Sequence, residues 1–148
     1  MRLNTASAII SLAKQLENDS AKFYEDLSAR HAKDKDILLS FAKENRKNVA
    51  QIERVYFGVI TDAIEGCFAF NIDADKYTFE SGMVPNESYH DALDRAIAIE
   101  KQIIKFYSDA AEQSNTLMAD IPRAFLIVAR KRDSRIQVLK SLLEKDDS

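Results

Sequence analysis

The sequence predicts an all-α fold, in which four helices form one bundle of two similar hairpins joined by a long crossover loop. Four segments repeat their apolar residues at the three- and four-residue spacing of an amphipathic helix. The chain contains only 3 Gly and 2 Pro, so long uninterrupted helices are expected. At 148 residues, one domain spanning residues 1–148 is the simplest organisation.

The first hairpin is predicted to contain two helices of about 25 residues, each roughly 37 Å long. The first helix runs from about Thr5 to Ala29, and its inner stripe is Ile9, Ala13, Leu16, Ser20, Phe23, Tyr24 and Leu27. The second begins after Asp34 and ends near Phe57, with a stripe of Leu38, Phe41, Ala42, Ile52 and Val55. The short polar connection between them is typical of antiparallel neighbours.

The second hairpin is predicted to begin at Ser88, where Asp91 at the third helical position resembles a capping box. This third helix continues through Leu93, Ala96, Ile99, Ile103, Phe106 and Tyr107. The fourth begins near Asp120, where Pro122 is tolerated because it lies in the first turn. Its apolar positions include Phe125, Val128, Ala129, Ile136, Leu139 and Leu143.

About thirty residues, Gly58 to Asn86, separate the two hairpins. This loop is long enough to cross the whole bundle, which predicts an up-down-down-up order of helices. Its aromatic residues within 75–79 are expected to pack across a helix face.

Composition excludes several classes of function. A net charge of −3 and a pI of about 5.4 give no electrostatic basis for binding nucleic acid or an anionic membrane. Cys67 is the single cysteine, so an internal disulfide or a thiolate metal cluster is impossible. Lys14 and Glu17 interrupt the first apolar run before it reaches the length of a signal peptide or membrane span. We therefore expect a cytoplasmic protein.

The two halves of the chain repeat each other. Glu17 is followed by Lys22-Phe23-Tyr24, and 83 residues later Glu100 is followed by Lys105-Phe106-Tyr107. The second and fourth helices align at an offset of 87, which pairs Ala42 with Ala129, Val49 with Ile136 and Ile52 with Leu139. Two such matches in the same order indicate duplication of a helical hairpin.

The repeat points to a candidate site. Positions seven apart lie nearly above one another on a helix, so Glu17 lies over Tyr24 and Glu100 over Tyr107. A bundle with pseudo-twofold symmetry brings these two glutamates face to face near its centre. The alternative is that each is an ordinary solvated glutamate at the edge of an apolar stripe, since buried carboxylates are rare.

These residues resemble a known family. Leu16-Glu17 with Phe23-Tyr24, and Ile99-Glu100 with Phe106-Tyr107, are similar to the first and third helices of rubrerythrin-type members of the ferritin-like superfamily. The stretch 71–79 is similar to the crossover of that group. The resemblance implies a ferritin-like bundle. In that family each half supplies a Glu from its first helix and a Glu-x-x-His from its second, and the six ligands hold two irons.

Carried over to this chain, the resemblance implies a degenerate site. The carboxylates that remain are the candidate residual metal ligands Glu17, Glu44 and Glu100, with Tyr24 and Tyr107 nearby. The other ligand positions are replaced by Lys47, Lys131 and Ser134. A shift of one residue does not restore the site, because it offers Arg132 and Arg135. Ammonium groups of the two lysines are expected to lie where the irons would be, unless they extend to water.

Three functions follow as alternatives. The first, which we favour, is a non-catalytic ferritin-like protein with a structural, regulatory or partner-binding role. The second is a residual metalloprotein in which the three glutamates hold a single divalent cation, iron by family resemblance. The third is a di-iron oxidoreductase of peroxide or iron metabolism, against which His31 and His90 argue because both fall near helix ends.

The resemblance also implies a homodimer, since bundles of this type pair through outer helix faces. The sequence supports a homodimer because the crossover region contains more aromatic residues than a single chain needs to bury there, and some of them are expected at an interface. They are Tyr56, Phe57, Phe68 and Phe70.

Overall fold

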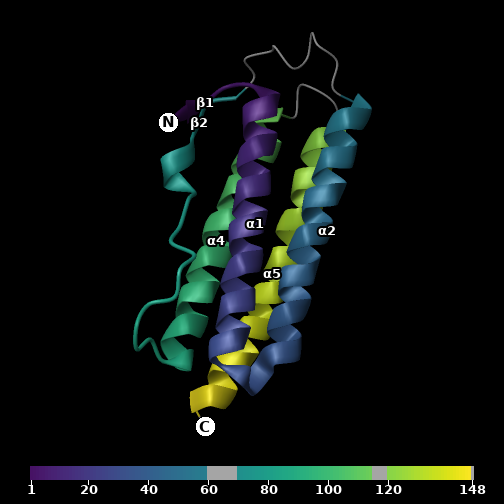
Figure 1. Ribbon diagram of the computed structural model, residues 1–148. Coiled ribbons are helices and arrows are strands. Elements are labelled where there is room, and N and C mark those ends of the chain that lie inside the picture. Colours follow the sequence, from purple (N-terminus) through teal and green to yellow (C-terminus); the bar gives the residue numbers. More distant parts are fainter. Residues whose placement is uncertain (60–69, 115–119, 148) are drawn as a thin grey trace.

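The computed structural model describes residues 1–59, 70–114 and 120–147, and it confirms the predicted all-α helical bundle (Figure 1). The four long helices are α1 (Ala6–Arg30), α2 (Lys35–Val59), α4 (Tyr89–Ser114) and α5 (Asp120–Asp147). Two short strands, β1 (Arg2–Leu3) and β2 (Ile72–Asp73), and two 3₁₀ turns, η1 (Ala32–Asp34) and η2 (Ala74–Lys76), complete the described elements.

The helices pack as two antiparallel pairs. α1 lies against α2 and α4 lies against α5, while α2 also contacts α5 and α1 contacts α4. Figure 1 shows that α2 and α4 run in the same direction, and that α1 and α5 both run the opposite way. The segment from Phe70 to Ser88 descends along the outside of the bundle beside α4. Residues 60–69, which include the rest of the predicted crossover, lie outside the described residues.

Local signals set the starts of the helices. The Thr5 side chain accepts a hydrogen bond from the backbone N–H of Ala8, which caps α1. Ser88 does the same for α4, because its Oγ accepts from the N–H of Asp91 at 3.0 Å. The predicted start of the third helix at Ser88 is therefore confirmed to within one residue.

The segment after residue 70 is fastened at several points. β2 pairs antiparallel with β1, so Leu3 lies opposite Ile72. Gln102 of α4 donates from Nε2 to the carbonyl oxygens of Lys76 and Thr78, at 3.0 and 2.9 Å. These bonds satisfy backbone groups that the irregular segment leaves unpaired.

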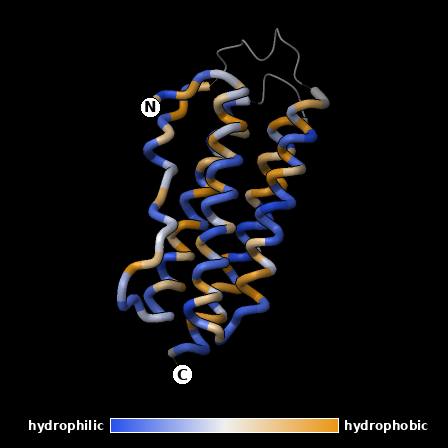
Figure 2. The backbone as a smooth tube through the Cα atoms, in the orientation of Figure 1, coloured by the Kyte–Doolittle hydropathy of each residue, from blue (hydrophilic) through white to orange (hydrophobic). Residues whose placement is uncertain are grey.

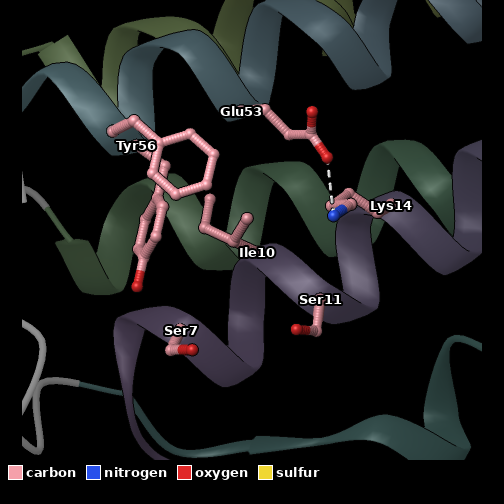
Figure 3. Close-up of a pocket in the computed structure, with 7 residues that line it drawn as sticks. Ser7, Ile10, Ser11, Lys14, Glu53 and Tyr56 are labelled. Atoms are coloured by element: carbon pink, nitrogen blue, oxygen red, sulfur yellow. Dashed lines mark ion pairs between the residues drawn. The ribbon is translucent and has the colours of Figure 1, made fainter.

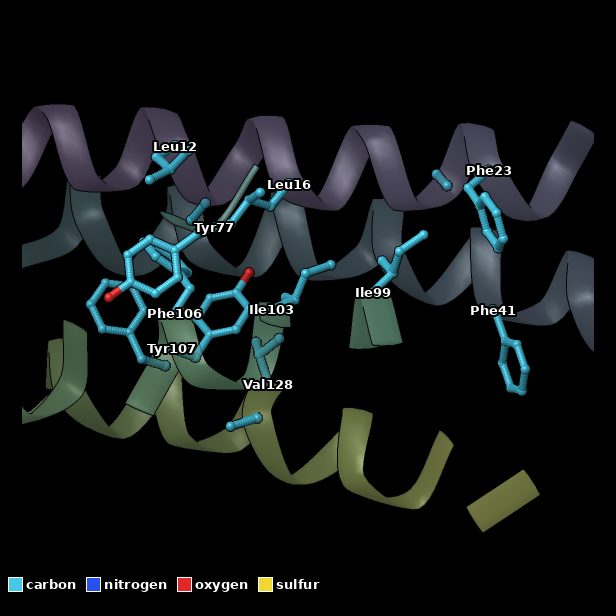
Figure 4. Packing of buried hydrophobic residues seen from close by; sticks show 14 of the residues in the cluster. Leu12, Leu16, Phe23, Phe41, Tyr77, Ile99, Ile103, Phe106, Tyr107 and Val128 are labelled. Atoms are coloured by element: carbon cyan, nitrogen blue, oxygen red, sulfur yellow. The ribbon is translucent and has the colours of Figure 1, made fainter. Parts of the chain in front are cut away.

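The expected aromatic packing of residues 75–79 is also present. The Tyr77 ring packs edge-on against Phe106, with centroids 5.6 Å apart (Figure 4). Phe79 is partly buried and packs against the core. The Tyr77 hydroxyl donates to Asp109 at 2.6 Å.

Apolar side chains from all four helices fill the interior. Figure 2 shows hydrophobic residues recurring along each helix between hydrophilic ones. Those that face inward form one continuous core, whose largest members include Phe23, Phe106, Phe125, Leu16 and Leu38. Within the described ranges, no helix is both long and apolar enough to cross a membrane.

Candidate functional site: a buried arginine–glutamate cluster

The centre of this apolar bundle holds four fully buried charged side chains. They are Glu17 of α1, Glu100 of α4, and Arg132 and Arg135 of α5, none more than 2% exposed. Two carboxylates and two guanidinium groups make the set electrically neutral. Removing charges from water is costly, so a cluster of this kind persists only when the charges are paired and hydrogen-bonded.

Arg132 links the two glutamates. Its Nη1 donates to Oε2 of Glu100 at 2.6 Å, and its Nε donates to Oε2 of Glu17 at 3.1 Å. Its Nη2 donates to the same Glu17 oxygen and to Oδ1 of Asn45. One guanidinium group therefore lies between carboxylates from two helices that the sequence repeat relates to each other.

Arg135, one turn further along α5, extends the cluster toward the outside of α2. Its Nη1 donates to Oδ1 of Asn45 at 2.8 Å and to Oε1 of Glu100 at 3.1 Å. Its Nη2 donates to Oε1 of Glu44 at 2.7 Å and to the carbonyl oxygen of Phe41. The Phe41 ring also lies under the guanidinium carbon at 4.8 Å, close enough for a cation–π contact.

Two asparagines of α2 complete the polar centre. Asn48 donates to Oε1 of Glu17 at 2.8 Å, and Asn45 donates to the Ser20 hydroxyl at 2.9 Å while its oxygen accepts from both arginines. Both asparagines are fully buried. Glu17 therefore has partners on α2 and α5, and Glu100 has partners on α5 and, through Tyr24, on α1, so the cluster ties all four helices together.

The predicted positions of Tyr24 and Tyr107 beside the glutamates are confirmed. Tyr24 donates from its hydroxyl to Oε1 of Glu100 at 2.8 Å. Tyr107 is equally buried, and its hydroxyl makes no hydrogen bond of ordinary geometry with another described residue. Burial raises the pKa of the Tyr107 hydroxyl, and Glu17 is close enough to raise it further. Burial and the neighbouring carboxylate raise the pKa of each tyrosine well above its ordinary value.

The charged groups hold one another in their ionised forms. Burial opposes ionisation of Glu100, but attraction to Arg132 and Arg135 outweighs it and lowers the pKa of this carboxyl. Burial likewise opposes the charge on Arg132, yet Glu100 and Glu17 raise the pKa of its guanidinium. Glu100 and Arg132 are therefore both charged at neutral pH.

The structure confirms that Glu17 and Glu100 face inward, and it corrects the predicted site positions on α2 and α5, the second helix of each hairpin. Glu44 is at the rim, with a side chain 38% exposed. Lys47 and Ser134 are exposed, and Lys131 is only partly buried. Of the two placements expected for the lysine side chains, the structure supports extension toward water and not a position between the glutamates.

The physical reason is a register error of one residue. Neighbouring positions on a helix point about 100° apart, so the inward residues are Asn45 and Asn48 of α2 and Arg132 and Arg135 of α5. The offset of 87 between α2 and α5 pairs Asn45 with Arg132 and Asn48 with Arg135. The offset of 87 thus pairs inward residues with inward residues, and the ligand positions implied by the resemblance lie one residue before them.

A signal for the correct register is present in the sequence. The buried apolar residues of α5 continue as Phe125, Val128, Leu139 and Leu142, and the same three-and-four spacing passes through 132 and 135. In α2 the spacing from Leu38 and Phe41 to Ile52 passes through 45 and 48.

The residues at this centre do not fit a di-iron group. Arginine offers no lone pair to a metal, and both guanidinium groups lie where positive metal ions would have to be held. Glu17 and Glu100 already accept hydrogen bonds from Arg132, and Glu44 accepts from Arg135. The three candidate residual ligands are thus each paired with an arginine.

The histidines lie at helix ends, as expected. His31 follows the last residue of α1, and His90 is in the first turn of α4. His90, Asp91 and Asp94 could together offer three ligand atoms within 4.8 Å of one another. Both aspartates are exposed and His90 lies 3.5 Å from Asp94, so this surface group is distinct from the buried cluster.

Comparison of the chain with protein-family models, with curated proteins and with solved structures finds no match.

Proposed function

We propose that this chain is a ferritin-like bundle of the rubrerythrin type whose metal centre has been replaced by an arginine–glutamate cluster. It acts in the cytoplasm as a structural, regulatory or partner-binding protein and not as a di-iron oxidoreductase. The observation that carries this proposal is Arg132, which bridges Glu17 and Glu100 at the middle of the bundle. A cation fixed in the chain supplies the charge compensation that metal ions supply in a carboxylate-rich site.

The symmetry of the cluster supports the relationship to ferritin-like proteins. The glutamates come from the first helix of each hairpin, and the pairs Asn45/Asn48 and Arg132/Arg135 come from the second helix at the i, i+3 spacing of a Glu-x-x-His motif. The parallel directions of α2 and α4 also agree with a crossover between hairpins (Figure 1).

Metal binding tests the functional part of the proposal. Protein purified without chelator, then mixed with ferrous iron under anaerobic conditions and dialysed, is expected to keep far less than one iron per chain. Its melting temperature is expected not to rise with added Fe²⁺, Mn²⁺ or Zn²⁺, because the carboxylates of the buried cluster are already paired with arginines. Retention of one iron would favour the residual metalloprotein, and retention of two with peroxide-dependent oxidation would favour the oxidoreductase.

We also propose that the chain forms a homodimer through the outer face of α1 and α2. This face contains a pocket of about 400 Å³, lined by Ser7, Ile10, Ser11, Lys14, Glu53, Tyr56 and Phe57 (Figure 3). Phe57 is 76% exposed, unusual for a large aromatic residue, whereas Phe70 is buried in the core and Phe68 lies outside the described residues.

Light scattering tests the dimer. The parent is expected to show a dimer mass, and Phe57→Glu is expected to shift it toward the monomer because a charge replaces the exposed aromatic ring at the proposed interface. Leu126→Glu, at an exposed apolar position of α5, is the matched control. A monomer mass for the parent across a wide concentration range would contradict the dimer.

A further inference from the structure

A second pocket opens on the surface between α2 and α5, directly outside the buried cluster. It has a volume of about 420 Å³ and is lined by Ser40, Phe41, Lys43, Glu44, Lys47 and Lys131. The lysine positions that the sequence suggested for the bundle interior therefore meet at this surface. The arginine–glutamate cluster does not use them.

The lining is strongly positive. Three of the six lining residues are lysines, and none of the three makes an ion pair with another residue in the described part of the chain. Glu44 is the only carboxylate among the lining residues. Unpaired like charges gathered in one concavity repel each other, and an anion placed between them relieves that repulsion.

A guanidinium group that is paired with Glu100 and Glu44 lies behind two of the lining residues. Arg135, whose side chain is 1% exposed, donates from Nη2 to the Phe41 carbonyl oxygen and to the Glu44 carboxylate, and both of these residues line the pocket. Its Nε is buried without a hydrogen-bond partner among the described residues. Glu44, at 38% exposure, is the outermost contact of this arginine.

We propose that this pocket is a binding site for a compact phosphate-bearing anion, held by Lys43, Lys47 and Lys131 in front of Arg135. Glu44 occupies part of the pocket when no anion is bound and competes with the anion for positive charge. The pocket is a single concavity on a chain of net charge −3, so a small phosphorylated molecule fits it better than a nucleic acid, which needs a continuous basic track. This inference does not depend on the ferritin-like relationship.

Calorimetric titration of the full chain with pyrophosphate tests the site. One pyrophosphate per chain is expected to bind, in a buffer whose ionic strength is held constant with chloride. Lys131→Gln and Lys47→Gln are each expected to weaken binding about two- to fivefold, the range for one partly exposed ion pair. Lys140→Gln, an exposed lysine of α5 outside the pocket, is the control for net charge and is expected to leave the affinity unchanged.

Glu44→Gln is expected to change the affinity for pyrophosphate in the opposite direction. Glutamine keeps a carbonyl oxygen for Arg135 but removes the competing charge, so pyrophosphate is expected to bind more tightly, again by two- to fivefold. Glu144→Gln, an exposed glutamate of α5 outside the pocket, is its control. The proposal fails if pyrophosphate gives no heat beyond that of chloride, or if the Lys140 and Glu144 controls change affinity as much as the pocket variants do.

A vesicle experiment distinguishes a lipid from a soluble source of the phosphate. Vesicles of phosphatidylcholine with phosphatidic acid are expected to bind no more protein than phosphatidylcholine alone if the ligand is soluble. Binding to phosphatidic acid that Lys131→Gln weakens and Lys140→Gln does not would place the same phosphate site on a lipid headgroup. Equal effects of the two lysine variants on vesicle binding, without pyrophosphate binding, would overturn the site.

Discussion

Arg132 is the residue on which the centre of the bundle depends. Its guanidinium group contacts Glu17, Glu100 and Asn45, and the planar, always-charged fork of arginine suits simultaneous contact with two carboxylates. A lysine would supply the charge but only a single ammonium nitrogen. This geometry explains why an arginine, and not a lysine such as Lys131, stands at the inward position.

Arg132→Gln is expected to lower the free energy of unfolding by about 3–5 kcal/mol, because two buried carboxylates lose their shared counter-charge. Urea denaturation at neutral pH measures the loss. Arg130→Gln, an exposed arginine on the same helix, is the control and is expected to change stability by less than about 0.5 kcal/mol. A loss below about 1 kcal/mol for Arg132→Gln would mean that the cluster is not held by this pairing.

The same cluster predicts how stability depends on acid. The pKa of Glu100 is lower in the folded state than in the unfolded chain, so the unfolded state binds protons first as the pH falls. The stabilisation is present above the ordinary pKa of 4.5 and is lost as the pH falls through the lowered folded-state pKa. Glu100→Gln is expected to flatten the acid limb of a plot of unfolding free energy against pH, and an unchanged limb would contradict the assignment.

The two buried tyrosines predict how stability depends on alkaline pH. The pKa values of Tyr24 and Tyr107 are raised in the folded state, so the unfolded chain loses these protons first and stability falls as the pH rises above about 10. Tyr107→Phe is expected to reduce that fall at little cost near neutrality, since the Tyr107 hydroxyl has no hydrogen-bond partner among the described residues. Denaturation at several pH values between about 7 and 11 measures it.

At the scale of elements, the four helices could be predicted because each carries a long stripe of apolar residues at helical spacing. The polar centre could not be placed as well. The three-and-four spacing passes through the buried asparagines and arginines, but these residue types are also common on solvated helix faces, and it is their contacts with other helices that identify them as inward. The candidate site was therefore predicted correctly on α1 and α4, where Glu17 and Glu100 adjoin aromatic pairs, and one residue too early on α2 and α5.

The segment beside α4 depends on Gln102. Its side-chain amide donates to two carbonyl oxygens of that segment, Lys76 and Thr78. Gln102→Ala is expected to speed amide hydrogen exchange in residues 72–80 at least several-fold, while lowering global stability by only about 1–2 kcal/mol. Lys101→Ala, the exposed neighbour on the same helix, is the control. Uniform acceleration across all helices would show that the segment does not open on its own.

For the whole molecule, rebuilding the metal ligands in the corrected register tests the proposed ancestry. Asn45→Glu, Asn48→His, Arg132→Glu and Arg135→His, introduced together, give two Glu-x-x-His motifs facing Glu17 and Glu100. This variant is expected to bind two Co²⁺ per chain with a visible spectrum absent from the parent, and its melting temperature is expected to rise with added metal.

A control variant and two possible outcomes show how the result for the corrected variant is to be interpreted. A second variant places the same motifs one residue earlier, by combining the native Glu44 with Lys47→His, Lys131→Glu and Ser134→His. It leaves both arginines in place and is expected to bind no pair of ions. If the corrected variant folds only with metal, the relationship is supported. If it folds without metal yet binds none, the four positions do not form a di-metal cavity and the ferritin-like proposal loses its main support.

The sequence by itself determined the all-α fold, the approximate bounds of the helices and the twofold repeat, because these depend on local spacing and on residue types that recur along the chain. It also indicated that two glutamates lie inside. Only the tertiary structure decided which polar residues of α2 and α5 accompany them, because a rotation of about 100° separates neighbouring residues and the choice rests on pairing across helices. Because of that pairing, the site predicted to hold a residual metal is instead a neutral cluster of arginine and glutamate.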